Sequence, residues 1–192
     1  MRAFPQEKLV RGSARSRLCR RDGGTAMVEM ALILPILILI MVGTLELGMA
    51  FKDFLTVSHA VREGSRVGAF VGDALDADCQ ILLASMAVLD PGEMDRLRRL
   101  EIYRADSSGN QILAQTNTWT YREGDPFDCG SWTEVVRWPS TERQVVVGST
   151  PLDIIGVRII MVRSWLTGFP PFSGSYYLNE TAIIRIEPEA FE

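Results

Sequence analysis

An acidic side chain stands close to the most hydrophobic part of the sequence. Glu29 is the fifth residue after Gly24, and the sixteen residues 30–45 carry no charge. An ionisable group this near an apolar core is costly unless it is paired. If the chain were cut after Gly24, Thr25 would carry a new ammonium group, and Glu29 would be its natural partner on the same chain or on a neighbouring one. The alternative is that Glu29 only lies at the level of the lipid headgroups.

The three cysteines offer a second kind of chemistry. Cys79 and Cys129 lie in the acidic part of the chain, whereas Cys19 lies in a basic N-terminal segment. If the acidic part is exported, an oxidising compartment permits a disulfide between Cys79 and Cys129. The alternative is two unpaired small hydrophobic residues, because the sequence has no CxxC motif. Cys19 does not follow the hydrophobic run, as the cysteine of a lipoprotein would.

Residue patterns for catalysis and metal binding are missing from the sequence. It has one histidine, His59, which we expect to be solvated, and it lacks the Walker A, GxGxxG, HExxH and GxSxG motifs. The acids in residues 73–78 resemble a weak calcium cluster, but they fit better as caps of a helix over residues 77–89. We therefore expect a protein that is not an enzyme and that has no metal, cofactor or small-molecule substrate.

The chemistry at Glu29 depends on the helix that carries it. The uncharged run is slightly short for a membrane span of about 20 residues. A helix over residues 25–51 contains only two acids, Glu29 and Glu46, and no basic residue. At about 1.5 Å per residue it would cross a hydrocarbon core about 30 Å thick. Pro35 should kink this helix, which membrane helices tolerate.

The distribution of charge predicts the orientation of the chain. Residues 1–24 contain seven basic and two acidic residues, a net charge of +5, whereas residues 25–192 contain 13 Lys and Arg and 22 Asp and Glu, a net charge of −9. Basic residues beside a span stay on the cytoplasmic side. We expect a single-pass protein of the cell membrane with a cytoplasmic N-terminus and an extracytoplasmic C-terminal domain. The acidic domain argues against nucleic-acid binding.

The helix is expected to continue beyond the membrane, because apolar residues recur with helical spacing through residues 52–72. Ala60, Gly64, Gly68 and Gly72 form a stripe of small residues at a spacing of four. Glycine costs about 1 kcal/mol in a helix interior, so the stripe indicates close packing on the protein's own head or on a neighbour. The alternative is fraying of the helix toward Gly72.

The remaining residues predict a small head, so that the fold class is α+β, with a long N-terminal transmembrane helix and a mainly antiparallel sheet. After the helix over 77–89, alternating apolar residues and turn signals predict strands. We expect these strands at 100–105, 111–114, 153–162 and 180–186, with a further possible strand at 144–147 and a loop at 168–174. The expected organisation is a basic leader at 1–24, the span at 25–51, its amphipathic extension at 52–72 and the extracytoplasmic head at 73–192.

Three stretches near the N-terminus resemble the TadE-like pseudopilin family. They are Gly24-Thr-Ala-Met-Val-Glu-Met-Ala-Leu-Ile-Leu-Pro, Gly43-Thr-Leu-Glu-Leu-Gly and Ala60-Val-Arg-Glu-Gly-Ser-Arg-Val-Gly-Ala, and together they cover roughly residues 20–70. A glycine, four residues and then a glutamate at the head of a hydrophobic helix also resemble the processing signal of type IV prepilins. Met30 stands where an aromatic residue is usual.

The resemblance implies a minor pilin-like component that takes part in assembly of a tight-adherence (Flp) pilus. It implies cleavage by a prepilin peptidase between Gly24 and Thr25, and contacts with other pilin-like and tight-adherence assembly proteins. Two other interpretations stay open. One is an unprocessed, membrane-anchored binding or adhesion domain, and the other is a secreted protein cut by signal peptidase after Ala50.

Overall fold

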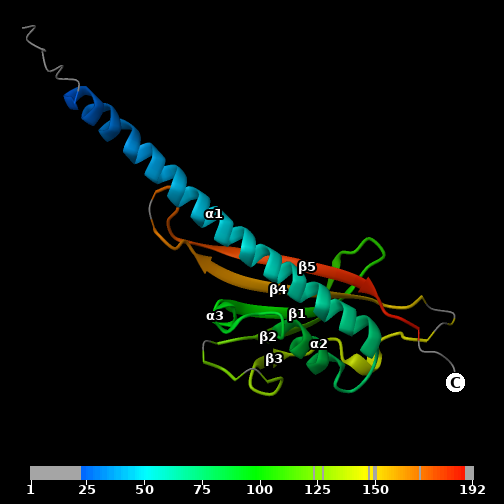
Figure 1. The fold of residues 1–192 in the computed structure, drawn as a ribbon. Helices are drawn as coiled ribbons and strands as arrows, with labels where there is room; N and C mark the ends of the chain where they lie inside the picture. The colour runs from blue at the N-terminus through cyan, green and yellow to red at the C-terminus, as the bar shows by residue number, and fades with distance from the viewer. Residues whose placement is uncertain are drawn as a thin grey trace, which may run out of the picture. The chain divides into compact units, whose positions relative to one another are not determined.

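The computed structural model describes residues 23–122, 124–126, 128–146, 148, 151–168 and 170–188. It has a long N-terminal helix, α1 (Gly23–Val71), followed by a five-stranded antiparallel sheet (Figure 1). The predicted α+β fold class is therefore confirmed. The described residues divide into two units between Met41 and Val42. Residues 1–22 of the expected leader, which include Cys19, lie outside the described residues.

The first unit contains the N-terminal turns of α1. Every residue from Gly24 to Met41 is exposed, and α1 stays helical through Pro35. Among the described residues, α1 is the one helix long and apolar enough to cross a membrane. Such a surface is costly in water, because exposed apolar area is unfavourable. It suits lipid or the helices of other membrane proteins, and it supports a role of α1 as a membrane anchor.

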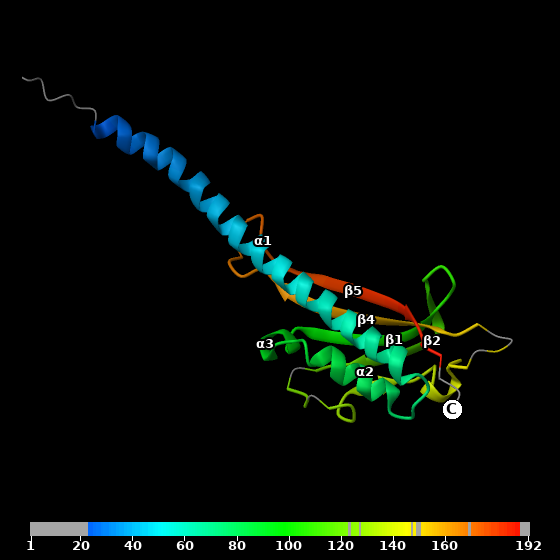
Figure 2. The same cartoon turned by 45° about the vertical axis from the view of Figure 1, so that its right-hand side comes forward.

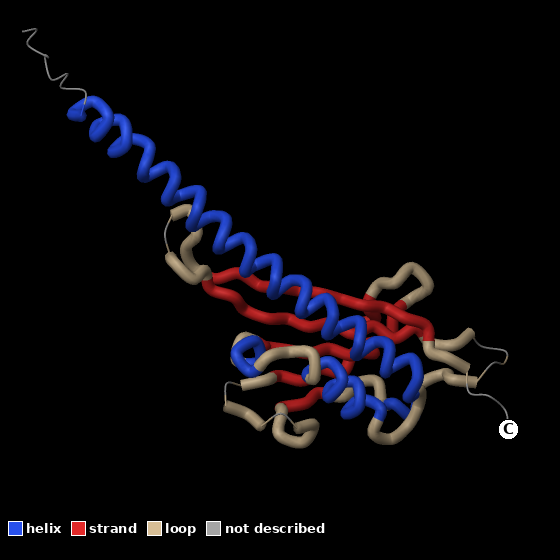
Figure 3. The backbone as a smooth tube through the Cα atoms, viewed as in Figure 1, coloured by secondary structure: helices blue, strands red, loops and turns tan. Residues whose placement is uncertain are grey.

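The head is built on one antiparallel sheet with the strand order β3-β2-β1-β4-β5. Its strands are β1 (Leu97–Ala105), β2 (Gln111–Thr120), β3 (Thr133–Val135), β4 (Ile154–Ser164) and β5 (Ser175–Arg185). The hairpin of β1 and β2 and both C-terminal strands were predicted, but β2 is six residues longer than expected and β5 begins five residues earlier. Figure 3 shows the five strands in red.

Helices cover one face of this sheet. In Figures 1 and 2, the C-terminal half of α1 and the shorter α2 (Ala77–Met86) lie on the same side of the strands. The core between them is formed by Val57, Ala60 and Val61 of α1, Ile81 and Leu82 of α2, and Ile155, Val157 and Ile159 of β4. Helix α2 starts where the sequence predicts but ends three residues before the expected position. A short α3 (Pro91–Met94) follows, and its Glu93 accepts a hydrogen bond from the Asp90 N–H (3.0 Å).

The opposite face of the sheet carries polar side chains, as one open face of an antiparallel sheet commonly does. Tyr103 of β1 is buried here because its ring lies over Gly156 of the neighbouring β4. The Arg158 guanidinium stacks on that ring at 5.3 Å, and Arg158 Nη1 also lies 3.4 Å from Glu101 Oε2. Burial raises the pKa of the Tyr103 hydroxyl, so this residue stays neutral and serves as packing.

This packing makes Gly156 sensitive to substitution. A Cβ at this position would overlap the Tyr103 ring, whereas a Cβ at Gly92 would meet nothing within 4 Å. Overpacking of this kind costs about 1–3 kcal/mol. We expect Gly156→Ala to lower the free energy of unfolding by about 2 kcal/mol and Gly92→Ala to leave it unchanged. Chemical denaturation of the full chain in detergent, followed by tryptophan fluorescence, measures both. Equal stability of the two variants would contradict the packing of Tyr103 on Gly156.

The prediction of a possible strand at Gln144–Val147 is wrong for the described residues 144–146, because these residues form a loop. The Gln144 N–H donates to the Asp153 carboxylate (3.0 Å) and not to a neighbouring strand. Val145 is buried against Gly72, at the end of α1. The alternation of this segment therefore reflects one buried valine in a loop, and Val147 lies outside the described residues.

Candidate functional site

The predicted processing site lies in the first two turns of α1, which contain Gly24, Thr25 and Glu29. A Cβ at Gly24 would meet nothing within 4 Å, and the Glu29 side chain is exposed. Glu29 lies four residues after Thr25, which is about 6 Å along the axis. The arrangement leaves Gly24 and Thr25 exposed and puts a carboxylate about one turn from Thr25.

The stripe of small residues faces the protein's own head. Ala60 is fully buried, and a Cβ at Gly64 would overlap the Ser85 hydroxyl of α2. A Cβ at Gly68 would lie only 3.0 Å from Ile155 Cδ1 and 3.1 Å from Ile81 Cδ1. Gly72 follows the last helical residue with φ +55°, a conformation that glycine adopts at little cost. Close approach of α1 to α2 and β4 therefore accounts for small residues at 64 and 68.

The same face of α1 carries two buried acids closer to the membrane span. Asp53 and Glu46 precede Ala60 by seven and fourteen residues, and a helix repeats its face after about seven residues. Asp53 is 4% exposed and Glu46 is 0% exposed. Buried carboxylates need partners because their desolvation is costly. Neither residue was predicted to have a role, although their spacing from Ala60 puts both acids in line with the small-residue stripe.

Asp53 is held by two arginines of the head. Its Oδ2 atom accepts a hydrogen bond from Arg96 Nη1 (2.9 Å) and forms a buried ion pair with Arg163, near the end of β4. Next to it, Lys52 Nζ donates to Glu93 Oε1 (3.0 Å), and this hydrogen bond raises the pKa of Lys52. We call Lys52, Asp53, Glu93, Arg96 and Arg163 the charged collar. The collar joins α1 to α3, to the residue that precedes β1 and to β4.

Glu46 is bound by the loop that connects β4 to β5, residues 165–174. Its carboxylate accepts hydrogen bonds from the backbone N–H groups of Leu166 (3.1 Å) and Thr167 (2.6 Å) and from the Thr167 hydroxyl (2.8 Å). Three donors satisfy a buried carboxylate without a cation. One turn earlier, Gly43 leaves room for the ring of Phe172, which a Cβ would meet at 3.3 Å. The loop and this part of α1 therefore form one packed unit.

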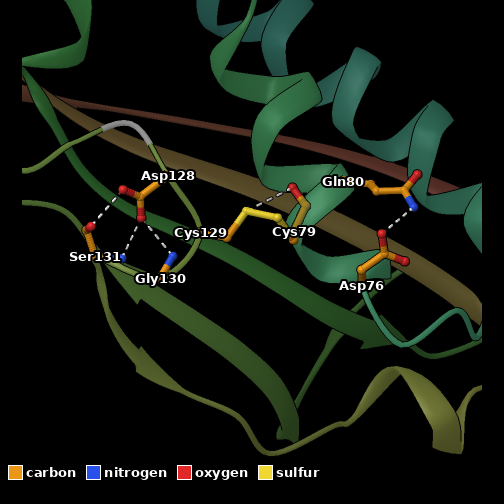
Figure 4. The surroundings of a disulfide bond; sticks show 7 residues. All are labelled: Asp76, Cys79, Gln80, Asp128, Cys129, Gly130 and Ser131. Carbon is orange, nitrogen blue, oxygen red and sulfur yellow. Dashed lines mark hydrogen bonds between the residues drawn. A yellow bond between two sulfur atoms is a disulfide. The ribbon is translucent and has the colours of Figure 1, made fainter.

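A disulfide joins Cys79 of α2 to Cys129, with a Cα–Cα distance of 5.4 Å (Figure 4). Beside Cys129, the Asp128 carboxylate accepts hydrogen bonds from Gly130 and Ser131, and the Ser131 hydroxyl bond lowers the pKa of Asp128. The disulfide ties the turn-rich segment before β3 to α2. In the chain-entropy model, a disulfide that closes a loop of this length stabilises the folded state by about 4 kcal/mol.

Thiol counting tests this bond. We expect the full-length protein, unfolded without reductant, to expose one thiol, that of Cys19, and to expose three after reduction. A chain that begins at Thr25 should expose none before reduction and two after it. Two additional free thiols in the unreduced sample would contradict the disulfide.

The acids at the start of α2 serve contacts within the protein. Asp78 pairs with Arg143 and accepts a hydrogen bond from Asn117 (2.8 Å), while Asp76 accepts one from Gln80 (2.9 Å). Asp76 occupies the N-cap position but makes no capping hydrogen bond there. Within the described ranges, no group of three or more His, Cys, Asp or Glu side chains is placed to hold a metal ion.

Comparison with known proteins supports the resemblance at the N-terminus. Residues 24–66 match the family model described as TadE-like protein, which confirms the TadE-like resemblance for this segment. The match begins at Gly24 and runs through the apolar turns of α1 to Gly64 and beyond. No curated protein and no solved structure matches the chain. The head from α2 onward lies outside the matched residues.

Proposed function

We propose that this chain is a minor pilin-like subunit that takes part in assembly of a tight-adherence pilus, with a structural and not a catalytic role. The single observation that carries the proposal is the TadE-like match over residues 24–66. That family points to a membrane protein associated with the tight-adherence pilus. In the proposal, a prepilin peptidase cleaves after Gly24 and Glu29 pairs with the new ammonium of Thr25 in an assembled neighbour.

The form of α1 supports this role. Its first turns present an apolar surface on all sides, with one carboxylate, Glu29, near the start. Its last turns are built into the head by the packing at Gly64 and Gly68 and by the charged collar. A helix fixed to its own head at one end and exposed at the other is suited to pack with helices of other membrane subunits. The proposed partners are therefore the peptidase and other pilin-like and assembly proteins of the system, with the head outside the cell membrane.

Cleavage can be tested with glycine variants. Gly24→Leu should leave a full-length protein in cells that contain the pilus system, because a large side chain at this position blocks close approach of the peptidase to the backbone. Gly48→Leu is the matched control, since a Cβ at Gly48 also meets nothing within 4 Å. It should be shortened like the unmodified chain. If Gly24→Leu is shortened as well, the proposed site is wrong.

The N-terminal sequence of the mature protein separates the three interpretations. A chain that starts at Thr25 supports the pilin-like subunit. A chain that still starts at Met1 favours an unprocessed anchored binding or adhesion domain. A chain that starts at Phe51 favours secretion after cleavage by signal peptidase, and it would have lost the apolar turns of α1.

A further inference from the structure

The loop between β4 and β5 has a composition unlike that of the rest of the head. Residues 164–179 form a run of sixteen residues without a charged side chain. The described part of this run contains four aromatic residues, Trp165, Phe172, Tyr176 and Tyr177. Trp165 packs against Phe172 (5.1 Å between ring centres) and against Tyr176 (4.8 Å). Trp165, Phe172 and Tyr176 therefore form one aromatic cluster at this end of the sheet.

Part of this apolar surface faces away from the protein. Leu166 and Tyr177 are each 71% exposed. The backbone N–H groups of Leu166 and Thr167 donate hydrogen bonds to the buried Glu46 carboxylate, and so does the Thr167 hydroxyl. Because these bonds hold the backbone in place, the outward position of the Leu166 side chain is a defined feature of the loop. Figures 1 and 2 show the loop beside α1 in both views.

The position of this loop along α1 relates it to the membrane. A span that starts at Thr25 needs about 20 residues to cross a core of about 30 Å, and so ends near Leu45. The loop contacts α1 at Gly43 and Glu46, which is this same level. Aromatic side chains such as Trp and Tyr favour the boundary between hydrocarbon and headgroups. The charged collar at Asp53 lies about 10 Å further along the helix, since seven residues separate it from Glu46.

From this arrangement we propose that the described part of this loop, residues 165–168 and 170–174, contacts the membrane, with the exposed Leu166 inserted into the interfacial region of the outer leaflet and the half-buried aromatic cluster beside it at the same level. Glu46 positions the loop by binding its backbone, and the loop in turn supplies the donors that allow a carboxylate at this depth. Leu166 lines an open cavity of about 260 Å³ together with Lys52, Asp53, Glu93, Arg96 and Arg163 of the collar. In the proposal these charged side chains lie at the level of the headgroups, just outside the inserted loop. The lipid bilayer is the partner that matches an uncharged loop with an exposed leucine and half-buried aromatic rings at this level.

The inference rests on the membrane anchor of the proposed function but not on the pilus role. It means that the head contacts the bilayer through two elements, the helix and the loop. Two separate contacts restrict rotation and tilt of the head, whereas a helix alone does not. The head would then present a defined face to subunits that lie in the same membrane.

Spin labels on the full chain in lipid nanodiscs can test the depth of the loop. Single cysteines are placed at Leu166→Cys, Leu113→Cys and Leu37→Cys in a Cys19→Ser background, with the Cys79–Cys129 bond intact. Leu113 is the matched control because it is also 71% exposed. It lies in β2 near the end of the sheet where Ala105 pairs with Gln111 and Ile154, opposite the end where Ser164 pairs with Ser175. Leu37 reports the apolar turns of α1.

Collision with oxygen, which concentrates in the bilayer, is compared with collision with a water-soluble nickel complex. We expect the ratio of oxygen to nickel accessibility at position 166 to be several-fold higher than at position 113, and closer to the ratio at position 37. Equal ratios at 166 and 113 would overturn the proposal, and so would protection of 166 from both reagents, which indicates a protein cover. If either outcome occurs while position 37 is exposed to lipid, α1 is a membrane anchor but the loop does not contact the bilayer. If 37 also reads as aqueous, the anchor itself is wrong.

Discussion

Replacing Glu29 by alanine should abolish most pilus assembly while the protein is still made, inserted and largely cleaved. In the proposed mechanism, the carboxylate pairs with the Thr25 ammonium of a neighbouring subunit. Within one helix this pairing is incomplete, because the first N–H groups of the helix compete for the same carboxylate. Between two helices offset along their axes the pair forms fully. An unpaired charge in a medium of low dielectric constant is costly, so the pair selects the register in which a subunit enters.

The measurements are recovery of pilin-like partners in a pull-down and counts of filaments, both at matched protein levels. Glu29→Asp, which is shorter by one methylene group, should be intermediate. Met30→Ala is a matched control, because Met30 is the adjacent exposed residue and carries no charge. It should assemble normally. Normal assembly of Glu29→Ala would mean that this residue only lies at the headgroup level and that the pilin-like mechanism does not apply.

The features of α1 could be predicted from the sequence, because they follow the helical periodicity of its own residues. The uncharged run and the spacing of Ala60, Gly64 and Gly68 predicted the extent of α1 to within one residue of its observed end. Residues three or four positions apart lie on the same face of a helix, so the sequence of a helix indicates which face is packed. The small residues of the stripe therefore predicted close packing of α1, although they did not identify α2 and β4 as the elements packed against it.

The second half of β2 was missed because its stabilising partners lie far away in the sequence. Residues 115–120 are mostly polar, and Asn117 in particular lacks the apolar character of a core position. In the structure Asn117 is fully buried, and its side chain donates to the Trp138 carbonyl (2.7 Å) and accepts from the Arg137 and Trp138 N–H groups. A loop twenty residues away thus satisfies a buried amide. Hydrophobic patterning does not report a partner of this kind.

The acids on the inner face of α1 were missed for a related reason. Glu46 interrupts the apolar stretch, and alone it indicates only the end of a span or a flank of a signal sequence. Its meaning depends on the loop of residues 165–174, some 120 positions later, whose backbone binds it. Heptad spacing from Ala60 through Asp53 to Glu46 would have placed both acids on the packed face. Because acids on a packed face need partners, that spacing would have predicted bound donors in the head, though not their identity.

Removing the Asp53 carboxylate should destabilise the head more than any other single change at the collar. Asp53→Ala leaves Arg163, which is 5% exposed, buried without its counter-ion, and it also removes the acceptor of Arg96. Breaking a buried ion pair by removing one partner costs about 3–5 kcal/mol. We therefore expect the free energy of unfolding of the full chain in detergent to fall by about 3 kcal/mol or more. Asp53→Asn keeps an acceptor without the charge and should be intermediate.

Glu63→Ala provides the matched control on the same helix. Glu63 pairs with Arg66 at 2.6 Å, but the side chains of Glu63 and Arg66 are 38% and 72% exposed, and exposed pairs contribute only about 0–1 kcal/mol. A second test replaces the buried pair by apolar residues, as in Asp53→Leu with Arg163→Met. This double variant should recover most of the stability lost in Asp53→Ala, because it removes the uncompensated charge together with its partner. If Asp53→Ala and Glu63→Ala are equally stable, the collar does not hold α1 to the sheet, and the junction depends on the Gly64 and Gly68 packing alone.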